Sequence, residues 1–417
     1  MKKILILGAN PETVSLVLKA KEMGIKTYVT DYNPTAYAKK YADVACNIDA
    51  TNVEELVNLV KSENIDGVLL GVAEALMPTY YTLCKNLNLP CFATLKQFEI
   101  MSSKDKFKNI CRQYNVPVVP EFNLENIKYI KFPVIVKPVD SCSSKGIAIC
   151  NDRITLNDAI INAKKFSKKK KVLIEKYING KEIIVYYVIQ NGNPFLVAMC
   201  DRFTNKPENG TVQLPTAYIY PSKYLREYYN KVDEKVRNML RQLNIKNGVL
   251  FLQGFFTENN QFYFYEPGFR LNGAQEHLIL ANLTKIDAKE LLIKFALNGE
   301  MSFDDLSKYA DPLLNGNLAC KLSPIFRCGK IGKIVGLEEI KKVDGLISLN
   351  PSYHDGDEIE GAGTLKQIVC RFFVKGKNKT ELKDRIDKIN NLFDVIDENG
   401  SSMLVSKFDT NILLKEY

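Results

Sequence analysis

The sequence predicts a mixed α/β and α+β protein, with a parallel sheet in an N-terminal domain, an antiparallel central region and a β-rich tail. Three observations support this prediction. Apolar runs alternate with helical periodicities over residues 1–95, strand patterns follow one another directly after residue 96, and short β-type runs dominate from residue 318. Alternating strands and helices favour a parallel sheet, whereas successive strands favour an antiparallel one.

The length of 417 residues exceeds that of one ordinary domain. We expect an N-terminal domain over 1–95, a central domain over 96–315 with a small lobe at about 115–190, and a C-terminal domain over 316–417 that completes the protein.

Composition excludes several classes of function. Apolar residues make up 46% and charged residues 25%, which is typical of soluble proteins. No segment approaches the roughly 20 apolar residues of a membrane helix, and "MKKILILGAN" fits a buried first strand better than a signal peptide. The ten cysteines are scattered without a CxxC pair, and only two histidines occur, so a zinc site or disulfide framework has no support. We therefore expect a cytoplasmic protein without membrane association.

The formal charge of +9 raises the question of nucleic acid. The lysines are spread along the chain, and the one dense run, Lys164–Val172, lies between a helical pattern and a strand, where a solvated loop is favoured over a binding patch. We expect no nucleic-acid partner. A diffuse excess of lysine instead favours small anionic ligands such as nucleotides.

The N-terminal domain shows strands at the apolar runs Lys3–Leu7, Thr27–Thr30, Gly67–Leu70 and Cys91–Ala93, separated by helical patterns. Ligands of parallel sheets gather where the strands end at their carboxyl side. The first such loop, "GANPET", is not a GxGxxG sequence, so a substrate-binding or structural role is favoured over dinucleotide binding. Glu74 and Asn10 belong to these loops, but helix capping would explain each of them equally well.

The stretch "FLQGFFTENNQFYFYEPGFR" (251–270) alternates apolar with small or polar residues, breaks at Glu258-Asn259-Asn260 and alternates again. This pattern predicts a two-stranded hairpin. Its second strand ends in Glu266 and Arg270, and Gln253 lies on the first strand. Without further context, an ion pair on the surface would account for Glu266 and Arg270.

Upstream, Lys137 ends a strand of β-branched residues and a serine-rich loop follows at 140–146. Loop amides and hydroxyls can donate to phosphate oxygens, Gly146 permits close approach of the backbone, and an ammonium group suits the same phosphates. A plain hairpin turn is the alternative. The later link "VLIEKYINGKE" carries Glu175 and Glu182, which would suit a nucleoside or an ordinary strand connection.

The order of these features resembles the ATP-grasp superfamily, in which two α+β lobes clamp ATP. The N-terminal part resembles the Rossmann-like domain that precedes the lobes in biotin carboxylase, carbamoyl phosphate synthase and the purine-biosynthesis ligases. The tail is similar to the C-terminal domain of those ligases and of the L-amino-acid ligases. The resemblance spans the whole chain and rests on an ordered set of features, since no single motif decides it. It implies a two-lobed ATP-grasp fold, ATP as the nucleotide and magnesium or manganese as the metal.

The resemblance also implies roles for particular residues. Lys106 in "SKDKFK" and Lys137 in "VIVKP" would bind phosphates. Glu266 would bridge metal ions, with Gln253 beside it as in carbamoyl phosphate synthase lobes, and Arg270 would stabilise the transferred phosphoryl group. The other implied positions are the loop over the triphosphate (Ser141, Ser143, Ser144, Gly146), the adenine clamp, mostly through its backbone (Glu175, Lys176, Ile178), the ribose acid (Glu182) and a substrate anion ligand (Arg202) at the root of a lid over 201–215.

One position departs from the family pattern. The usual ending E-h-N-x-R is "EPGFR" here, with Gly268 in place of an asparagine that would bind metal. Asn272 or a water would have to replace that ligand. The departure puts the number of metals, and turnover itself, in question.

The leading hypothesis is an ATP-dependent carboxylate–amine ligase that forms an acyl phosphate and releases ADP and phosphate. Two alternatives are a stand-alone enzyme similar to carbamoyl phosphate synthase and an ATP-binding protein with weakened or no turnover. The partners implied are a small carboxylate, a small amine and, because relatives are often dimers, a second copy of the chain.

Overall fold

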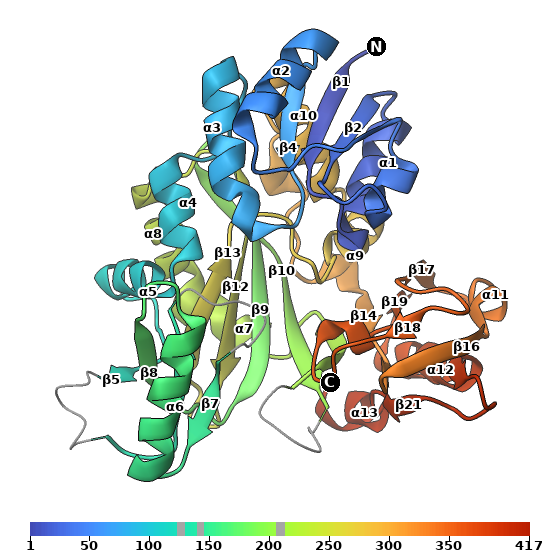
Figure 1. Ribbon diagram of the computed structural model, residues 1–417. Helices are drawn as coiled ribbons and strands as arrows, with labels where there is room; N and C mark the ends of the chain where they lie inside the picture. Colours follow the sequence, from blue (N-terminus) through green and yellow to red (C-terminus); the bar gives the residue numbers. More distant parts are fainter. Residues whose placement is uncertain (123–129, 140–145, 206–212) are drawn as a thin grey trace.

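The computed structural model describes residues 1–122, 130–139, 146–205 and 213–417. A large sheet runs through the middle of the molecule, with the N-terminal domain at one end, a small lobe beside it and the β-rich tail on the opposite side (Figure 1). None of the helices within these ranges is long and apolar enough to cross a membrane.

The N-terminal sheet is parallel, with the strand order β3-β2-β1-β4. Its central strands are apolar on both faces because helices cover both, as crossover connections require. The expected strand Cys91–Ala93 is wrong: these residues form an irregular segment, and the Phe92 ring packs edge-on against Phe98 and Phe269. The elements are β1 (Lys3–Leu7), α1 (Val14–Glu22), β2 (Lys26–Thr30), β3 (Val44–Cys46), α2 (Val53–Glu63), β4 (Gly67–Leu70), α3 (Met77–Leu87) and α4 (Leu95–Ser102).

The small lobe is an antiparallel sheet in the order β5-β8-β6-β7, and α6 packs on it. Its core consists of short apolar side chains such as Val134, Val136 and Ile174, which face Leu156 and Ala163 of α6. The helix α5 leads into this lobe. The elements are α5 (Lys104–Gln113), β5 (Glu121–Phe122), β6 (Val134–Pro138), β7 (Ala148–Cys150), α6 (Arg153–Phe166) and β8 (Val172–Lys176).

The large sheet is antiparallel, and over the described residues its order is β13-β12-β9-β10-β11-β14-β19-β17. Strands from the C-terminal part therefore extend the sheet of the central part without a break. The strands are β9 (Lys181–Gln190), β10 (Asn193–Thr204), β11 (Pro215–Tyr220), β12 (Gly248–Phe256), β13 (Phe262–Gly268), β14 (Leu318–Leu322), β17 (Leu346–Pro351) and β19 (Cys370–Gly376).

The two faces of the large sheet have different surroundings. On the back face, the Tyr187 hydroxyl donates to Asp233 Oδ1 at 2.5 Å and lies 2.7 Å from the Tyr228 hydroxyl, both in the helical segment that covers this face. The front face, to which Glu182 and Arg202 belong, carries the polar side chains described below. The remaining elements are α7 (Leu225–Tyr228), α8 (Glu234–Gln242), α9 (His277–Leu283), α10 (Ala288–Asn298), β15 (Ile325–Phe326), β16 (Gly329–Val335), α11 (Leu337–Ile340), β18 (Glu358–Ile359), α12 (Lys379–Leu392), β20 (Asp394–Asp397), β21 (Leu404–Ser406) and α13 (Asn411–Glu416).

The Tyr187→Phe substitution tests the back-face contact. Removal of the hydroxyl deprives buried Asp233 of one donor, so we expect the free energy of unfolding to fall by about 1–3 kcal/mol in urea denaturation. Tyr229→Phe is the matched control. Tyr229 is 58% exposed, so removal of its hydroxyl should leave the free energy of unfolding almost unchanged. Equal costs for the two variants would contradict this role of the back face.

Candidate functional site

A row of charged and aromatic side chains crosses the front face of the large sheet. Glu182 lies opposite Arg202, Arg202 opposite Tyr218, and Tyr218 opposite Lys321, on four neighbouring strands. Opposed residues of antiparallel strands share a face, so this register brings the four side chains together. Arg202 forms an ion pair with Glu182 and donates to the Tyr218 hydroxyl at 3.3 Å, and Lys321 Nζ lies 4.4 Å from the centre of the Tyr218 ring. We call these four residues the charged row.

Side chains whose oxygen atoms could bind a metal ion lie on the hairpin β12–β13, at the edge of the same face. Gln253 lies directly opposite Glu266, next to a β-bulge that adds Tyr265 to β13. Bulges re-aim side chains, and the Tyr265 hydroxyl here donates to Gln253 Oε1 at 3.1 Å. Glu266 is partly exposed, and Lys104 Nζ lies 3.3 Å from its Oε1. A carboxylate and an amide oxygen at one edge match the hard ligands that magnesium prefers.

Arg270 follows the hairpin and reaches the N-terminal domain. Its Nη2 lies 3.3 Å from Glu74 Oε2, and its Nη1 donates to the Leu271 carbonyl oxygen at 3.0 Å. Its Nε is buried without a hydrogen-bond partner in the part of the chain that the structure describes. Burial raises the pKa of Glu74, and Arg270 opposes that effect. The guanidinium thus retains donor capacity beside Glu266.

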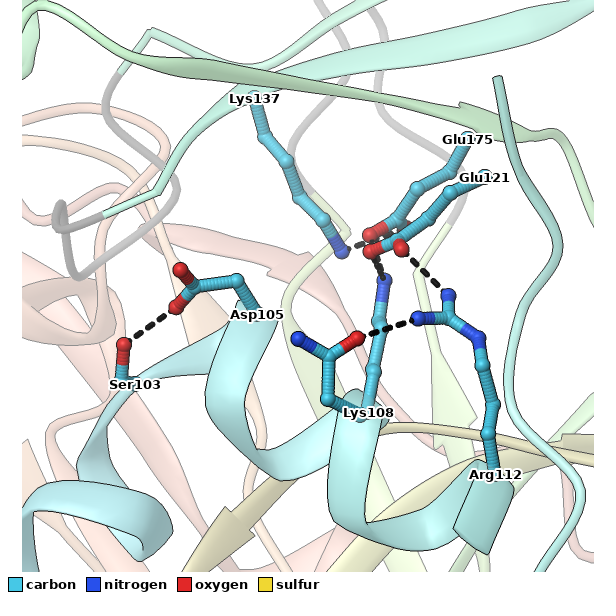
Figure 2. A network of polar contacts seen from close by, with 8 residues as sticks. Ser103, Asp105, Lys108, Arg112, Glu121, Lys137 and Glu175 are labelled. Carbon is cyan, nitrogen blue, oxygen red and sulfur yellow. Dashed lines mark hydrogen bonds and ion pairs between the residues drawn. The ribbon is translucent and has the colours of Figure 1, made fainter. Parts of the chain in front are cut away.

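The helix α5 presents basic residues at a spacing of four, which places them on one face. Lys104 reaches Glu266. Lys108 pairs with Glu175 of β8 and with Glu121 of β5, and Arg112 pairs with Glu121 (Figure 2).

The structure does not place Lys106 beside these groups. Lys106 lies about half a turn from Lys104 on α5, is 42% exposed and pairs with Glu99. Its role in phosphate binding stays a prediction. The lysine of this helix that contacts Glu266 is Lys104.

Lys137 belongs to the small lobe and faces the hairpin. Its Nζ lies 2.6 Å from Glu175 Oε2 and 5.6 Å from the centre of the Tyr265 ring, and the side chain is only 7% exposed. Burial lowers the pKa of Lys137, against the attraction of Glu175. Burial alone would raise the pKa of Glu175, but Lys137 and Lys108 outweigh it and hold that pKa below its ordinary value. Glu175 therefore contributes its side chain as well as its backbone to this region.

The remaining predicted residues divide into two groups. Ser141, Ser143 and Ser144 lie outside the described residues. Gly146 has φ +76°, and a Cβ there would lie 2.9 Å from Phe166 and 3.0 Å from Pro138, so packing against α6 already requires a glycine. In the segment predicted to clamp adenine, Ile178 is buried, while the exposed Lys176 donates its backbone amide to the Pro120 carbonyl oxygen at 2.9 Å.

A family model described as "ATP-grasp domain" matches residues 130–274. This part of the chain is therefore similar to ATP-grasp domains. The large chain of carbamoyl phosphate synthase from Clostridium botulinum is 22% identical over 407 residues, which cover 92% of this chain and 36% of that protein. The chain thus spans about a third of the length of the curated relatives it matches.

Solved structures share the fold over nearly the whole chain. The biotin carboxylase domain of 2-oxoglutarate carboxylase from Hydrogenobacter thermophilus, solved with MgADP and bicarbonate, has a TM-score of 0.79 at 19% identity and covers 100% of this chain and 94% of its own. An L-amino acid ligase from Bacillus licheniformis has a TM-score of 0.78 at 19% identity and covers 96% and 99%. The predicted fold class and the resemblance to the ATP-grasp superfamily are confirmed.

Gly268 has a structural cause. A Cβ at this position would lie 2.1 Å from Cζ of Phe251, whose ring also lies 5.4 Å from the Arg270 guanidinium. The ring therefore occupies the space that a longer side chain would need. Asn272 has other partners: its Oδ1 accepts from the Ala274 amide at 3.0 Å, and its Nδ2 lies 3.5 Å from the Tyr186 hydroxyl.

A second group, missed from the sequence, lies where the ATP-grasp domain meets the C-terminal strands. Arg371 of β19 pairs with Glu12 of the N-terminal domain at 3.1 Å. Lys321 is 3% exposed, and its Nζ has no hydrogen bond or ion pair within the described ranges. Burial lowers the pKa of Lys321 well below the ordinary value. Burial raises the pKa of Glu276 to about 8, and its Oε2 is without a described partner. Strand register, which no local pattern encodes, brings Lys321 into the charged row.

The Gly268→Asn substitution tests the steric account. The new side chain must displace Phe251, so we expect the free energy of unfolding to fall by about 1–3 kcal/mol. The same substitution in a Phe251→Ala background should cost clearly less, because the ring is gone. Urea denaturation of the four proteins measures both costs, and equal costs in the two backgrounds would contradict the account.

The Glu276→Gln substitution tests the raised pKa. Between pH 4.5 and pH 8 the native state keeps a proton that the unfolded chain loses, so this group makes the free energy of unfolding fall as pH rises. The slope is at most about 1.4 kcal/mol per pH unit. The variant lacks this term, so its stability relative to the original protein should rise from pH 5 to pH 7 in urea denaturation. If the difference in the free energy of unfolding between the two proteins stayed constant from pH 5 to pH 7, the pKa of Glu276 would not be raised.

Proposed function

We propose that the chain is an ATP-dependent carboxylate–amine ligase that activates a carboxylate as an acyl phosphate. The observation that supports this proposal is the convergence of Lys104, Lys137, Glu266 and Arg270 on the hairpin β12–β13, between the small lobe and the large sheet. These side chains come from three separate segments, since Glu266 and Arg270 both lie at the end of the hairpin. Two ammonium groups, a carboxylate and a guanidinium in one place suit a triphosphate with its metal.

In the proposed reaction, an oxygen of the acid substrate attacks the terminal phosphorus of ATP and ADP departs. The amine then attacks the acyl carbon, loses a proton and displaces phosphate. Lys104 and Lys137 would bind phosphate oxygens. Arg270 would stabilise charge on the transferred group through its Nε, which has no partner among the described residues. Glu266 and Gln253 would hold magnesium, which when bound neutralises charge on the phosphates. Their opposed oxygens fit that ion, with the phosphates supplying further ligands.

The acid substrate would bind at the charged row. Lys321 is the one cation of that row without an acidic partner in the described structure, since Arg202 is held by Glu182. A buried ammonium that lacks a counter-ion favours an incoming carboxylate. The Arg202 guanidinium pairs with Glu182, the predicted ribose acid, and its role as a substrate anion ligand stays a prediction. Arg202 remains adjacent to the substrate in the proposed arrangement.

A stand-alone enzyme similar to carbamoyl phosphate synthase is the second candidate, because the curated relatives carry that name. Release of ADP from ATP and magnesium, measured over pools of amino acids, other small carboxylates and amines, and over bicarbonate with ammonia, separates the two. A carboxylate–amine ligase responds to an acid and amine pair, whereas the second candidate responds to bicarbonate with ammonia. If the protein binds nucleotide but releases ADP in none of these pools, only a nucleotide-binding function would remain. A homodimer stays a prediction.

The pair Lys104→Met and Lys106→Met tests the phosphate contacts. Loss of a charge-assisted hydrogen bond costs about 1.5–3 kcal/mol, so we expect Lys104→Met to weaken MgADP binding about tenfold or more. Lys106→Met should change the Kd less than about twofold, because Lys106 pairs with Glu99 at the surface. Isothermal titration calorimetry measures both. The opposite ranking would restore the sequence-based assignment.

A further inference from the structure

Two buried lysines share one buried carboxylate at the base of the small lobe. The Glu175 side chain is 2% exposed, and its two oxygens face different cations: Oε1 contacts Lys108 and Oε2 contacts Lys137 (Figure 2). The Lys108 side chain is 0% exposed and that of Lys137 is 7% exposed. A single counter-ion would satisfy the charge of Glu175, so one of the two lysines requires a further explanation.

The two lysines are not held equally. Lys108 Nζ also lies 3.0 Å from Glu121 Oε1, so two carboxylates hold it. Glu175 is the one acidic partner of Lys137 in the described ranges. Glu121 keeps a second cation, Arg112, and both of these residues line a surface groove at the outer edge of the lobe. Lys108 is therefore held by two ion pairs, whereas Lys137 has one ion pair among the described residues.

This difference decides what happens when Lys137 moves. An isolated buried carboxylate is strongly unfavourable, so Lys137 could not leave Glu175 if it were the sole counter-ion. Because Lys108 remains on the other oxygen, departure of Lys137 leaves Glu175 paired. An anion that attracts Lys137 would also neutralise the excess of one positive charge among these three side chains.

We propose that Lys108 is a positioning residue for nucleotide binding: it holds Glu175 in place so that Lys137 can transfer from that carboxylate to a nucleotide phosphate. The proposal rests on the proposed function, because it needs a phosphate near Lys137. Lys108 does not touch the nucleotide. Its neighbour on the same face of α5, Lys104, already contacts Glu266, so one helix both supplies a cation to the phosphate region and frees a second cation for it.

A double-mutant cycle on Lys108 and Glu175 tests the proposal, with the MgADP Kd measured by calorimetry. In the Lys108→Met variant, Lys137 is the only counter-ion of Glu175, and we expect the Kd to rise about tenfold or more. In a Glu175→Gln background no buried carboxylate needs a counter-ion, so adding Lys108→Met should change the Kd less than about twofold. Lys108→Gln gives the same comparison if the methionine variant does not fold.

Lys289→Met is the matched control, because Lys289 is 5% exposed, lies on α10 away from the small lobe and pairs with Asp287. It should lower stability and leave the MgADP Kd unchanged. The proposal would be overturned if Lys108→Met raised the MgADP Kd by the same factor in both Glu175 backgrounds. It would also be overturned if Lys108→Met lowered stability and left the Kd unchanged, because Lys108 would then have only a structural role. If the unaltered protein binds no MgADP, the proposed function itself fails, which is a separate result.

Discussion

Alternation of side chains across an antiparallel sheet is the constraint on which the site depends. Opposed residues share a face, so the register of the large sheet fixes that Gln253, Glu266, Glu182, Arg202 and Lys321 all belong to its front face. A shift of one residue in any pairing would turn one of these groups toward the helices of the back face. The extension of the sheet into the C-terminal part has the same effect at larger scale, because it brings Lys321 to the face that carries the hairpin oxygens.

Charge pairing then determines which groups remain for a ligand. Most buried ions here have partners: Arg202 has Glu182, and Lys108 has two carboxylates. Buried charges without partners are costly, so the exceptions carry information. Lys321 lacks an acidic partner, and Arg270 keeps a buried Nε without an acceptor among the described residues. Both exceptions lie near Glu266 or the charged row, where the proposed reaction would place a phosphate and a carboxylate.

The sequence was sufficient for the fold class, because its signals are local. Alternation with a polar break predicts the hairpin, and the end of its second strand predicts Glu266 and Arg270. The sequence "SKDKFK" does not show which side of its helix faces inward. Lys104 and Lys106 are two residues apart, and the buried residues Phe107, Lys108 and Cys111 identify the inward side in the structure. The role of Lys106 in phosphate binding stays a prediction.

Long-range contacts explain what the sequence could not supply. Lys321 and Glu276 acquire their surroundings from strands and helices distant along the chain, and no spacing rule connects them. The sequence shows that Gly268 departs from the family pattern. The structure shows the reason, because the ring of Phe251 on the neighbouring strand leaves no space for a side chain at this position. Predictions from local pattern therefore hold for the longer elements and fail for the short run Cys91–Ala93, whereas the identity of individual site residues depends on packing and register.

A crystal structure of the protein with ADP and magnesium would show whether the two lobes enclose the phosphates. We expect the terminal phosphate of ADP between the two lobes, with the Lys104 and Lys137 ammonium groups within about 3 Å of its oxygens and Lys137 withdrawn from Glu175. ADP bound on another surface, or bound between the lobes with both lysines still on Glu266 and Glu175 and far from the phosphate, would contradict this expectation.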